Sequence, residues 1–182
     1  MLRNLAAAVA YYLYNGFITH VPFYSIRHAY LRGILGFPIG RGTAVHMGCF
    51  FTGRRISIGA DSVINRRCYL DGRAGLVIGD KVSVSPECYI LSLTHDVNSP
   101  DFKAIPKPVE IKDYVWLGAR CIILPGVTLG EGCVAAAGAV VSKPAEDYAI
   151  VAGVPARKIG DRQRGLNYAP RYFPLFDTDI TL

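Results

Sequence analysis

The chain has 182 residues, which is enough for one domain with its own core. Apolar residues make up 51% of the chain and charged residues only 19%, a balance that favours a large interface between subunits. The formal net charge is +6, but the sequence has no clustered Lys/Arg tract and no nucleic-acid motif, so we expect no nucleic-acid partner. The charge fits either a general surface bias or an anionic partner, such as a phosphorylated cofactor or a membrane surface.

Residues 1–37 form an N-terminal segment with short apolar stretches. Leu5–Leu13 is apolar, but no small-residue cleavage site follows it, and later charged and proline residues interrupt any span of about 20 apolar residues. The pattern predicts two amphipathic helices, roughly 2–19 and 24–35, separated by Pro22. Such helices either pack on the main domain or lie peripherally on a membrane.

A six-residue period follows, over roughly residues 38–160. Its first positions are almost all aliphatic: Ile58, Ile64, Leu70, Ile78, Val84, Ile90, Ile111, Leu117, Ile123, Leu129, Ala135 and Val141. Its fifth positions are small or β-branched: Ser62, Cys68, Val82, Cys88, Thr94, Val115, Cys121, Val127, Cys133 and Ala139. This period matches neither a helix nor a plain alternating strand. It predicts short strands joined by tight corners, with three hexads closing one coil and successive coils about 4.8 Å apart.

The cysteines occupy the same inward register. Four stand at fifth positions, and Cys49 does too if an earlier hexad starts at Val45. No CxxC pair occurs, so we expect buried free thiols rather than zinc ligands or disulfides. Free thiols favour a reducing compartment, and we therefore predict a cytoplasmic protein, either free or peripheral to the inner face of the membrane.

The repeat is interrupted once at length, by a polar, proline-rich loop over residues 96–110. His95 stands directly before this loop. Interruptions of a solenoid often carry its function, so this histidine is a candidate site residue. In the later coils, Ala119 and Ala137 are 18 residues apart and should stack, which leaves room for an extended ligand close to the backbone.

The interrupted repeat and the closing Val151–Arg157 motif resemble the hexapeptide-repeat acyltransferases, and within them the sugar O-acetyltransferases similar to galactoside and maltose acetyltransferases. The resemblance covers roughly residues 38–160. It implies an all-β fold, a left-handed parallel β-helix, although crossover connections are usually right-handed. It also implies a homotrimer with active sites between subunits, acetyl-CoA as cosubstrate and no required metal. Residues 1–37 would then be a helical segment and residues 161–182 a C-terminal tail.

By this resemblance His95 is the general base that takes the proton of the acceptor hydroxyl, a role that suits an imidazole near neutral pH. Asn65 matches an asparagine of the acceptor site and would bind the acceptor or the developing oxyanion. Asp71 and Arg73 are candidate acceptor ligands, although Arg73 stands where the family has a carboxylate. The residues that fall on cofactor-binding positions are Trp116, Gly118, Ala119, Ala137, Ser142, Lys143 and Arg157. Lys143 and Arg157 would meet the phosphates of the cosubstrate, and Gly160 stands where the family has a second basic residue.

The coil positions predict where these residues lie. Asn65, Gly118 and Ala136 hold the second place in the middle hexad of their coils and should share one face, whereas His95 ends a third hexad at a different edge. A neighbouring subunit would then bring a histidine to the Asn65 face. Segments His46–Gly48 and Tyr172–Asp177 are similar to members associated with polysaccharide biosynthesis, which favours a saccharide acceptor, either free, nucleotide-linked or lipid-linked.

The same fold class also supports other functions. An enzyme of the same fold could act on a non-sugar acceptor, either an antibiotic hydroxyl or serine, or could acetylate the nitrogen of an aminosugar, and these alternatives stay open. A γ-carbonic-anhydrase-like protein needs three histidine ligands, whereas the repeat offers His95 and, near its start, His46. A non-catalytic trimeric scaffold would have no need of His95.

Overall fold

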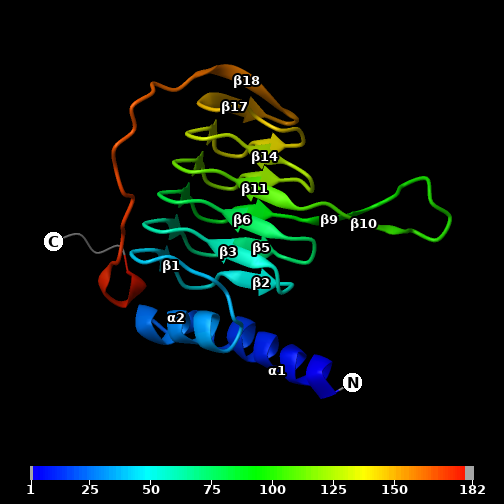
Figure 1. Ribbon diagram of the computed structural model, residues 1–182, viewed down its shortest axis with the longest axis vertical. Coiled ribbons are helices and arrows are strands. Elements are labelled where there is room, and N and C mark those ends of the chain that lie inside the picture. The colour runs from blue at the N-terminus through cyan, green and yellow to red at the C-terminus, as the bar shows by residue number, and fades with distance from the viewer. Residues whose placement is uncertain (1, 179–182) are drawn as a thin grey trace.

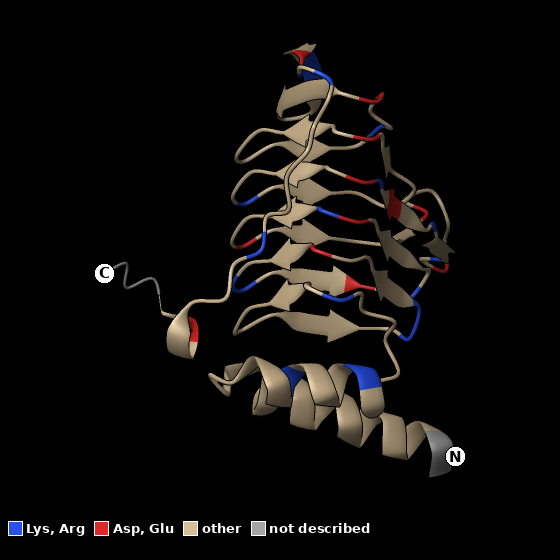
Figure 2. Ribbon diagram, turned by 60° about the vertical axis from the view of Figure 1, so that its left-hand side comes forward, with Lys and Arg blue, Asp and Glu red and all other residues tan. Residues whose placement is uncertain are grey.

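Short strands form the three sides of a triangular column in the computed structural model, which describes residues 2–178 (Figures 1 and 2). Sheet I contains β1 (Ala44–Val45), β4 (Val63–Ile64), β7 (Ser83–Val84), β12 (Trp116–Leu117), β15 (Val134–Ala135), β17 (Ala149–Gly153) and β18 (Ala156–Asp161). Sheet II contains β2 (Phe50–Thr52), β5 (Tyr69–Asp71), β8 (Tyr89–Ile90), β13 (Ile122–Ile123) and β16 (Val140–Val141). Sheet III contains β3 (Ile56–Ile58), β6 (Leu76–Ile78), β11 (Val109–Ile111) and β14 (Thr128–Leu129).

The chain visits sheets I, II and III in turn, and the five strands of sheet II mark five turns. Neighbouring strands of a sheet come from successive turns and run parallel, except for the final antiparallel pair of β17 and β18. The hexad register explains this geometry. Each first-position aliphatic side chain points into the column, and the small fifth-position side chain fits beside it. Leu70, Ile90 and Ile123, for example, are fully buried on successive turns of sheet II.

All five cysteines are buried and free, as their register predicts. They line the inside of the column, where a small side chain leaves room for the aliphatic residue of the neighbouring hexad. Glycine is required at one corner for the opposite reason. A Cβ on Gly118 would lie 2.5 Å from the backbone nitrogen of Ala137, so successive turns can approach closely only without that side chain.

Two helices close the lower end of the column: α1 (Leu2–Gly16) and α2 (Tyr24–Gly33), joined through the short helix η1 (Ile18–His20). Tyr14 and Leu31 are fully buried between these helices and the first turn. The ring of Tyr14 meets that of Phe51 at 5.5 Å. The first helix ends three residues earlier than predicted because the backbone leaves the helical region at Phe17, with φ −133°. Within residues 2–178, no helix is long and apolar enough to cross a bilayer.

The predicted loop is largely a β-hairpin. Strands β9 (Leu93–His95) and β10 (Ala104–Pro106) pair antiparallel and project away from the column (Figure 1). The hairpin leaves between sheet II and sheet III, because it follows β8 and precedes β11.

The C-terminal segment returns along the column to the helices (Figures 1 and 2). Arg162 donates to the carbonyl of Tyr114 at 3.0 Å, and Arg171 pairs with Asp61 at 2.6 Å. The segment ends in the short helix η2 (Leu175–Asp177), which lies beside the helical end of the column. The first and last parts of the described chain therefore meet at one end.

Candidate active site

The corner between sheets I and II carries a column of second-position residues. Backbone amides of Asn65, Ser85, Gly118 and Ala136 donate in turn to the carbonyls of Val84, Leu117, Ala135 and Val151, which stacks these residues one above another. Ser85 was not among the predicted site residues, although it occupies the same register. Its hydroxyl accepts a hydrogen bond from the indole of Trp116 at 3.2 Å, and Trp116 is 46% exposed.

Asn65 is held by one of its two amide hydrogens. Its Nδ2 donates to the carbonyl of Val84 at 2.9 Å, and the side chain is half-buried. An asparagine amide has two N–H donors and one carbonyl acceptor. Within residues 2–178 the second N–H and the side-chain carbonyl oxygen make no hydrogen bond, so both are available to a ligand at this corner.

His95 stands at the root of the hairpin with a fixed tautomer. Its Nδ1 lies 2.8 Å from the carbonyl oxygen of Phe102, and because that partner can only accept, Nδ1 carries the proton. The imidazole also stacks on the Phe102 ring, with centroids 3.9 Å apart and planes 12° from parallel. Nε2 then presents a lone pair, and it has no hydrogen-bond partner among residues 2–178.

His95 and Asn65 lie at different corners of one subunit. Asn65 follows β4 at the corner of sheets I and II, whereas His95 belongs to the hairpin between sheets II and III. This separation agrees with the coil positions in the sequence. Since the hairpin also points away from the column (Figure 1), one chain alone does not bring the two side chains together.

Asp71 and Arg73 share the corner from which the hairpin leaves, but they differ in access. Asp71 is fully buried, and its carboxylate accepts from the Arg73 guanidinium at 2.9 and 3.0 Å and from the backbone amides of Arg73 and Ser92 at 2.9 and 3.0 Å. Burial opposes ionisation of this carboxyl, yet these hydrogen bonds outweigh it and lower its pKa below the usual value. The structure thus places Asp71 behind Arg73 as its support, and only the Arg73 side chain, which is 45% exposed, faces solvent.

The residues expected to bind a cosubstrate fall into two places. Trp116, Gly118, Ala119 and Ala137 belong to the corner of sheets I and II. Ala119 and Ala137 are exposed, and the carbonyl of Ala119 accepts from the amide of Gly138 at 2.8 Å, so the two small side chains sit on adjacent turns. Side chains this small leave the backbone along that edge accessible, and we call this edge the track.

Lys143 and Arg157 lie elsewhere, around a cavity of about 330 Å³ near the far end of the column. Ser142 directly precedes Lys143 and is exposed beside it. Ala137 lies before β16 and Lys143 lies after it, so β16 separates the cavity from the edge that carries Ala119 and Ala137. Lys158 also lines this cavity, but its ammonium is engaged by Asp161 at 2.7 Å. Sequence spacing alone could not predict that Lys143 and Arg157 line one cavity, because this depends on β18 folding back antiparallel on β17.

Known proteins match this chain in sequence and structure. The family model described as bacterial transferase hexapeptide (six repeats) matches residues 108–143. Nodulation protein L of Rhizobium meliloti is 36% identical over 138 residues, covering 73% of this chain and 74% of that protein. Galactoside O-acetyltransferase of Lactococcus lactis is 35% identical over 118 residues, covering 61% and 56%. The chain spans 39%, 55% and 56% of the length of three curated acetyltransferases that it matches.

Solved structures agree. The hexapeptide-repeat acetyltransferase VCA0836 of Vibrio cholerae, complexed with acetyl coenzyme A, superposes with a TM-score of 0.77 at 27% identity, covering 87% of this chain and 86% of that one. A galactoside acetyltransferase in complex with coenzyme A gives a TM-score of 0.74 at 25% identity, covering 86% and 79%. Within residues 2–178, no group of three or more His, Cys, Asp or Glu side chains could hold a metal ion. The hexad register, the parallel β-helical column and these similarities together place the chain in the hexapeptide-repeat acyltransferase family.

Proposed function

We propose that this chain transfers the acetyl group of acetyl-CoA to a hydroxyl of a sugar or saccharide precursor, with His95 as general base. The single observation that carries the proposal is the hydrogen bond of 2.8 Å between Nδ1 of His95 and the Phe102 carbonyl, which leaves Nε2 as a free base on an exposed arm. The galactoside O-acetyltransferases among its relatives support a hydroxyl acceptor.

The reaction follows from this tautomer. Nε2 of His95 removes the proton of the acceptor hydroxyl while its oxygen attacks the thioester carbonyl. The C–O bond forms, and when the tetrahedral intermediate collapses the C–S bond breaks and the leaving thiolate takes the proton back from the imidazolium. The Phe102 carbonyl holds the ring throughout and stabilises the imidazolium while it exists, the role that a carboxylate has in a Ser-His-Asp triad.

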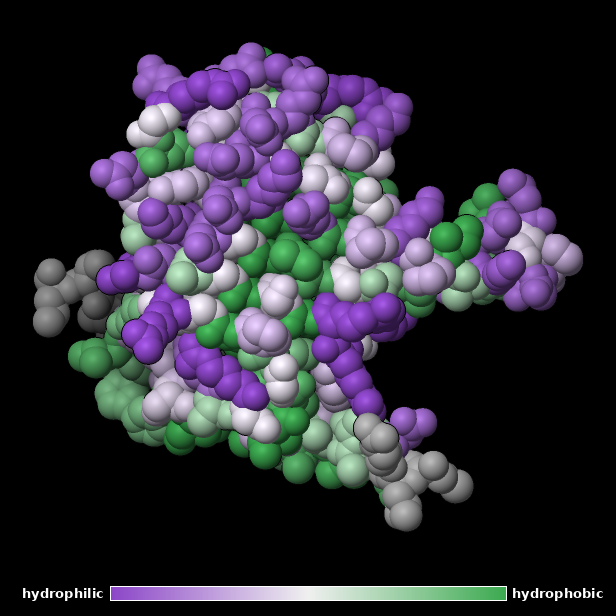
Figure 3. Space-filling model, viewed as in Figure 1, coloured by the Kyte–Doolittle hydropathy of each residue, from purple (hydrophilic) through white to green (hydrophobic). Residues whose placement is uncertain are grey.

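A second group must stabilise the oxyanion, and Asn65 suits that role through its free N–H. Because Asn65 and His95 lie at different corners, we propose that the chain acts as a homotrimer in which the hairpin of one subunit reaches the Asn65 corner of the next. Stacked aromatic rings on the outside of sheet II support a covered face, with Phe50, Tyr69 and Tyr89 at 5.2 and 6.0 Å between centroids. Figure 3 shows apolar surface on the column beside the hairpin.

Acetyl-CoA fits the open track at the same corner. The small side chains of Ala119 and Ala137 let a pantetheine arm lie against the backbone, with Gly118 at the close approach of the turns. The exposed cations Lys143 and Arg157 would then bind phosphate groups, with Ser142 beside them. Acetyl-CoA and CoA are the ligands in the matched structures of the Vibrio cholerae and galactoside enzymes.

For the acceptor, the exposed guanidinium of Arg73 shares the corner of the hairpin and would hydrogen-bond a saccharide. A competing acceptor is an amino group, because N-acyltransferase structures with a dTDP-linked aminosugar also match, with a TM-score of 0.64. Five free buried thiols fit a reducing compartment. We propose the cytoplasm, with the N-terminal helices towards the inner face of the membrane.

The test is a thiol-release assay with acetyl-CoA over free and nucleotide-linked sugars, aminosugars, serine and chloramphenicol. A sugar hydroxyl should give the highest kcat/KM, and mass spectrometry should locate the acetyl group on oxygen. An acetyl group found on nitrogen would mean that the acceptor is an amine and not a hydroxyl. Light scattering tests the assembly. A chain that is monomeric at micromolar concentration would contradict the proposed active site between subunits.

A further inference from the structure

The outer face of α1 carries an apolar stripe that no part of the described chain covers. Its members recur at helical spacing and are exposed: Leu5, Val9, Tyr12 and Leu13, with the exposed Phe17 directly after the helix. The opposite side of the helix carries Tyr11 and Tyr14, which pack on the first turn of the column together with Ile18 of η1. A helix that is apolar on both sides needs a second apolar partner beyond the one it already has.

The stripe is part of a wider surface at the helical end of the column. Phe23 and Ile26, next to and on α2, are 50% and 46% exposed, and Phe176 of η2 lies 5.8 Å from Phe23, ring to ring. Leu175 is 81% exposed beside them. Figure 3 shows this lower face as largely apolar. We call these residues of α1, α2 and η2 the cap face.

Charge around the cap face has one sign. Residues 1–60 contain six arginines and no aspartate or glutamate. This third of the sequence therefore carries the whole formal net charge of +6 of the chain. Arg32 and Arg54 are exposed at its margins, whereas Asp177, the acidic residue of η2, is buried and paired with Arg27. Within residues 2–178, the cap face is therefore bordered by exposed cations and its own carboxylate is buried, and such a face is complementary to a surface of anionic lipids.

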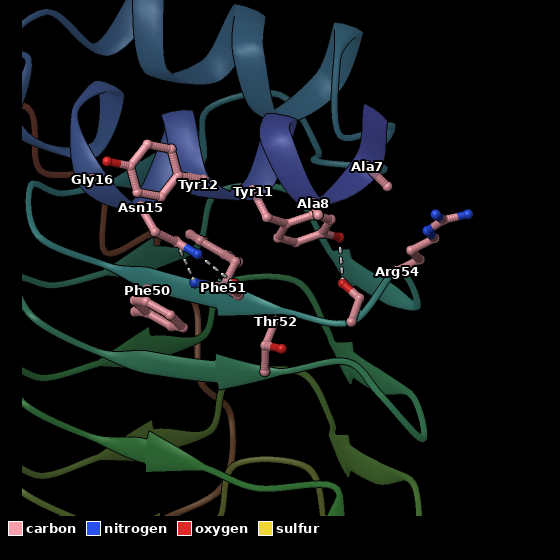
Figure 4. Close-up of a pocket in the computed structure, with 11 residues that line it drawn as sticks. Ala7, Ala8, Tyr11, Tyr12, Asn15, Gly16, Phe50, Phe51, Thr52 and Arg54 are labelled. Carbon is pink, nitrogen blue, oxygen red and sulfur yellow. Dashed lines mark hydrogen bonds between the residues drawn. The ribbon is translucent and has the colours of Figure 1, made fainter. Parts of the chain in front are cut away.

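A pocket beside the stripe adds concave apolar surface at this end of the column. It lies between α1 and β2, holds about 570 Å³ and is mostly apolar (Figure 4). Tyr12 belongs to both the stripe and the pocket, and Arg54 stands at the rim. Such a hollow could accept part of a hydrocarbon chain while the guanidinium meets a phosphate. Arg54 also belongs to the corner from which the hairpin leaves, two turns before His95.

We infer that the cap face is a docking surface for an anionic phospholipid bilayer. The stripe supplies apolar area, the aromatic rings suit the interface between headgroups and acyl chains, and Arg54 contributes attraction to phosphate. This inference goes beyond the acetyl-transfer proposal and does not depend on it, because binding to vesicles requires neither acetyl-CoA nor His95.

The test measures partition of the full chain onto phosphatidylcholine vesicles with and without phosphatidylglycerol. We expect binding to the anionic vesicles that weakens in high salt. The variant Leu5→Ser/Val9→Ser/Leu13→Ser should lower the partition coefficient at least about tenfold, and Arg54→Gln should lower it about fivefold. A matched control, Val97→Ser/Val154→Ser/Ile159→Ser, removes exposed apolar side chains away from the cap face and should bind as the wild type does.

Equal binding of the stripe variant and the wild type would overturn the inference, as would absence of binding to anionic vesicles. Light scattering on the same samples tests the alternative that a second copy of the chain covers the cap face. If the wild type forms a larger assembly than the stripe variant and ignores vesicles, then a second copy covers the cap face and the lipid assignment is wrong. Circular dichroism of each variant checks that the column is folded, and failure of acetyl transfer alone would leave the inference unaffected.

Discussion

Nδ1 of His95 and the carbonyl oxygen of Phe102 lie 2.8 Å apart across the hairpin, and the two rings stack at 3.9 Å between centroids. Phe102 thus fixes both the tautomer and the plane of the imidazole. The backbone at Phe102 has φ +51°, a left-handed conformation that turns its carbonyl and its ring back towards His95.

Replacing His95 with alanine removes the base and should leave the rest of the site in place. General base catalysis typically contributes 10²–10⁴-fold, so we expect kcat to fall by about that factor. Affinity for acetyl-CoA and the size of the assembly should not change. Near-normal turnover with a good acceptor would contradict the proposal, and a covalently trapped acetyl group would indicate a different route.

Phe102 is a positioning residue whose effect runs through His95. Phe102→Ala keeps the carbonyl but removes the stacked ring, and aromatic pairs are worth about 0.5–1.5 kcal/mol. We expect kcat to fall about three- to tenfold while KM for acetyl-CoA is unchanged, with partial recovery in Phe102→Tyr. A loss confined to KM for acetyl-CoA would show that the hairpin acts in binding instead.

Ala137 tests the track for the pantetheine arm. Ala137→Trp places a large side chain on the exposed corner without entering the column, so the fold should persist while the Kd for CoA rises at least about tenfold. The matched control is Lys112→Trp, an equally exposed change on another corner. Calorimetry measures the Kd for CoA of both variants. A wild-type Kd in Ala137→Trp would show that the pantetheine arm does not bind along this edge.

Lys143 tests the phosphate end of the same ligand. Lys143→Ala should weaken CoA more than dephospho-CoA if the ammonium meets the 3′-phosphate, and a charge-assisted contact of about 1.5–3 kcal/mol corresponds to roughly ten- to hundredfold. The neighbouring Lys158 serves as the control, because Asp161 already engages its ammonium. Equal losses for both ligands would place Lys143 at another phosphate or at none.

The fold could be predicted because the hexad register depends on local side-chain size. An aliphatic residue every sixth position and a small one four places later specify strand, corner and inward direction together, and so they also predicted buried, free cysteines. The separation of Asn65 from His95 followed from the same counting. Helix ends were less certain, as the early end of α1 at Gly16 shows.

Contacts between distant segments could not be predicted from the repeat. Asp71 was expected to meet the acceptor, but the buried salt bridge to Arg73 depends on how the corner closes over Ser92. The cavity shared by Lys143 and Arg157 depends on the reversal of β18. The C-terminal segment has no period at all, and its return to the helices depends on a few polar contacts, chiefly those of Asp177.

Asp177 ties the C-terminal segment to the N-terminal helices. Its buried carboxylate lies 2.6 Å from Nδ1 of His46, 3.1 Å from Arg27 and 3.0 Å from Arg66, and it accepts from the amide of Met47. Burial opposes ionisation of this carboxyl, but the hydrogen bond from His46 and the surrounding charges outweigh it, so its pKa is lowered. A carboxyl with a lowered pKa in the folded state stabilises the fold above its unfolded pKa of about 3.9 and loses that contribution as pH falls through the folded value.

We therefore expect Asp177→Asn to lower the free energy of unfolding at pH 7 by about 3–5 kcal/mol, because Arg27 is left buried without its counter-charge. Urea denaturation at several pH values measures this, with Asp161→Asn, an exposed ion pair, as the control of small effect. As the pH falls below about 4, the difference between wild type and Asp177→Asn should shrink, since protonation removes the same charge from the wild type. A difference that stays constant down to pH 2 would mean that the charge of Asp177 does not hold the two ends of the chain together.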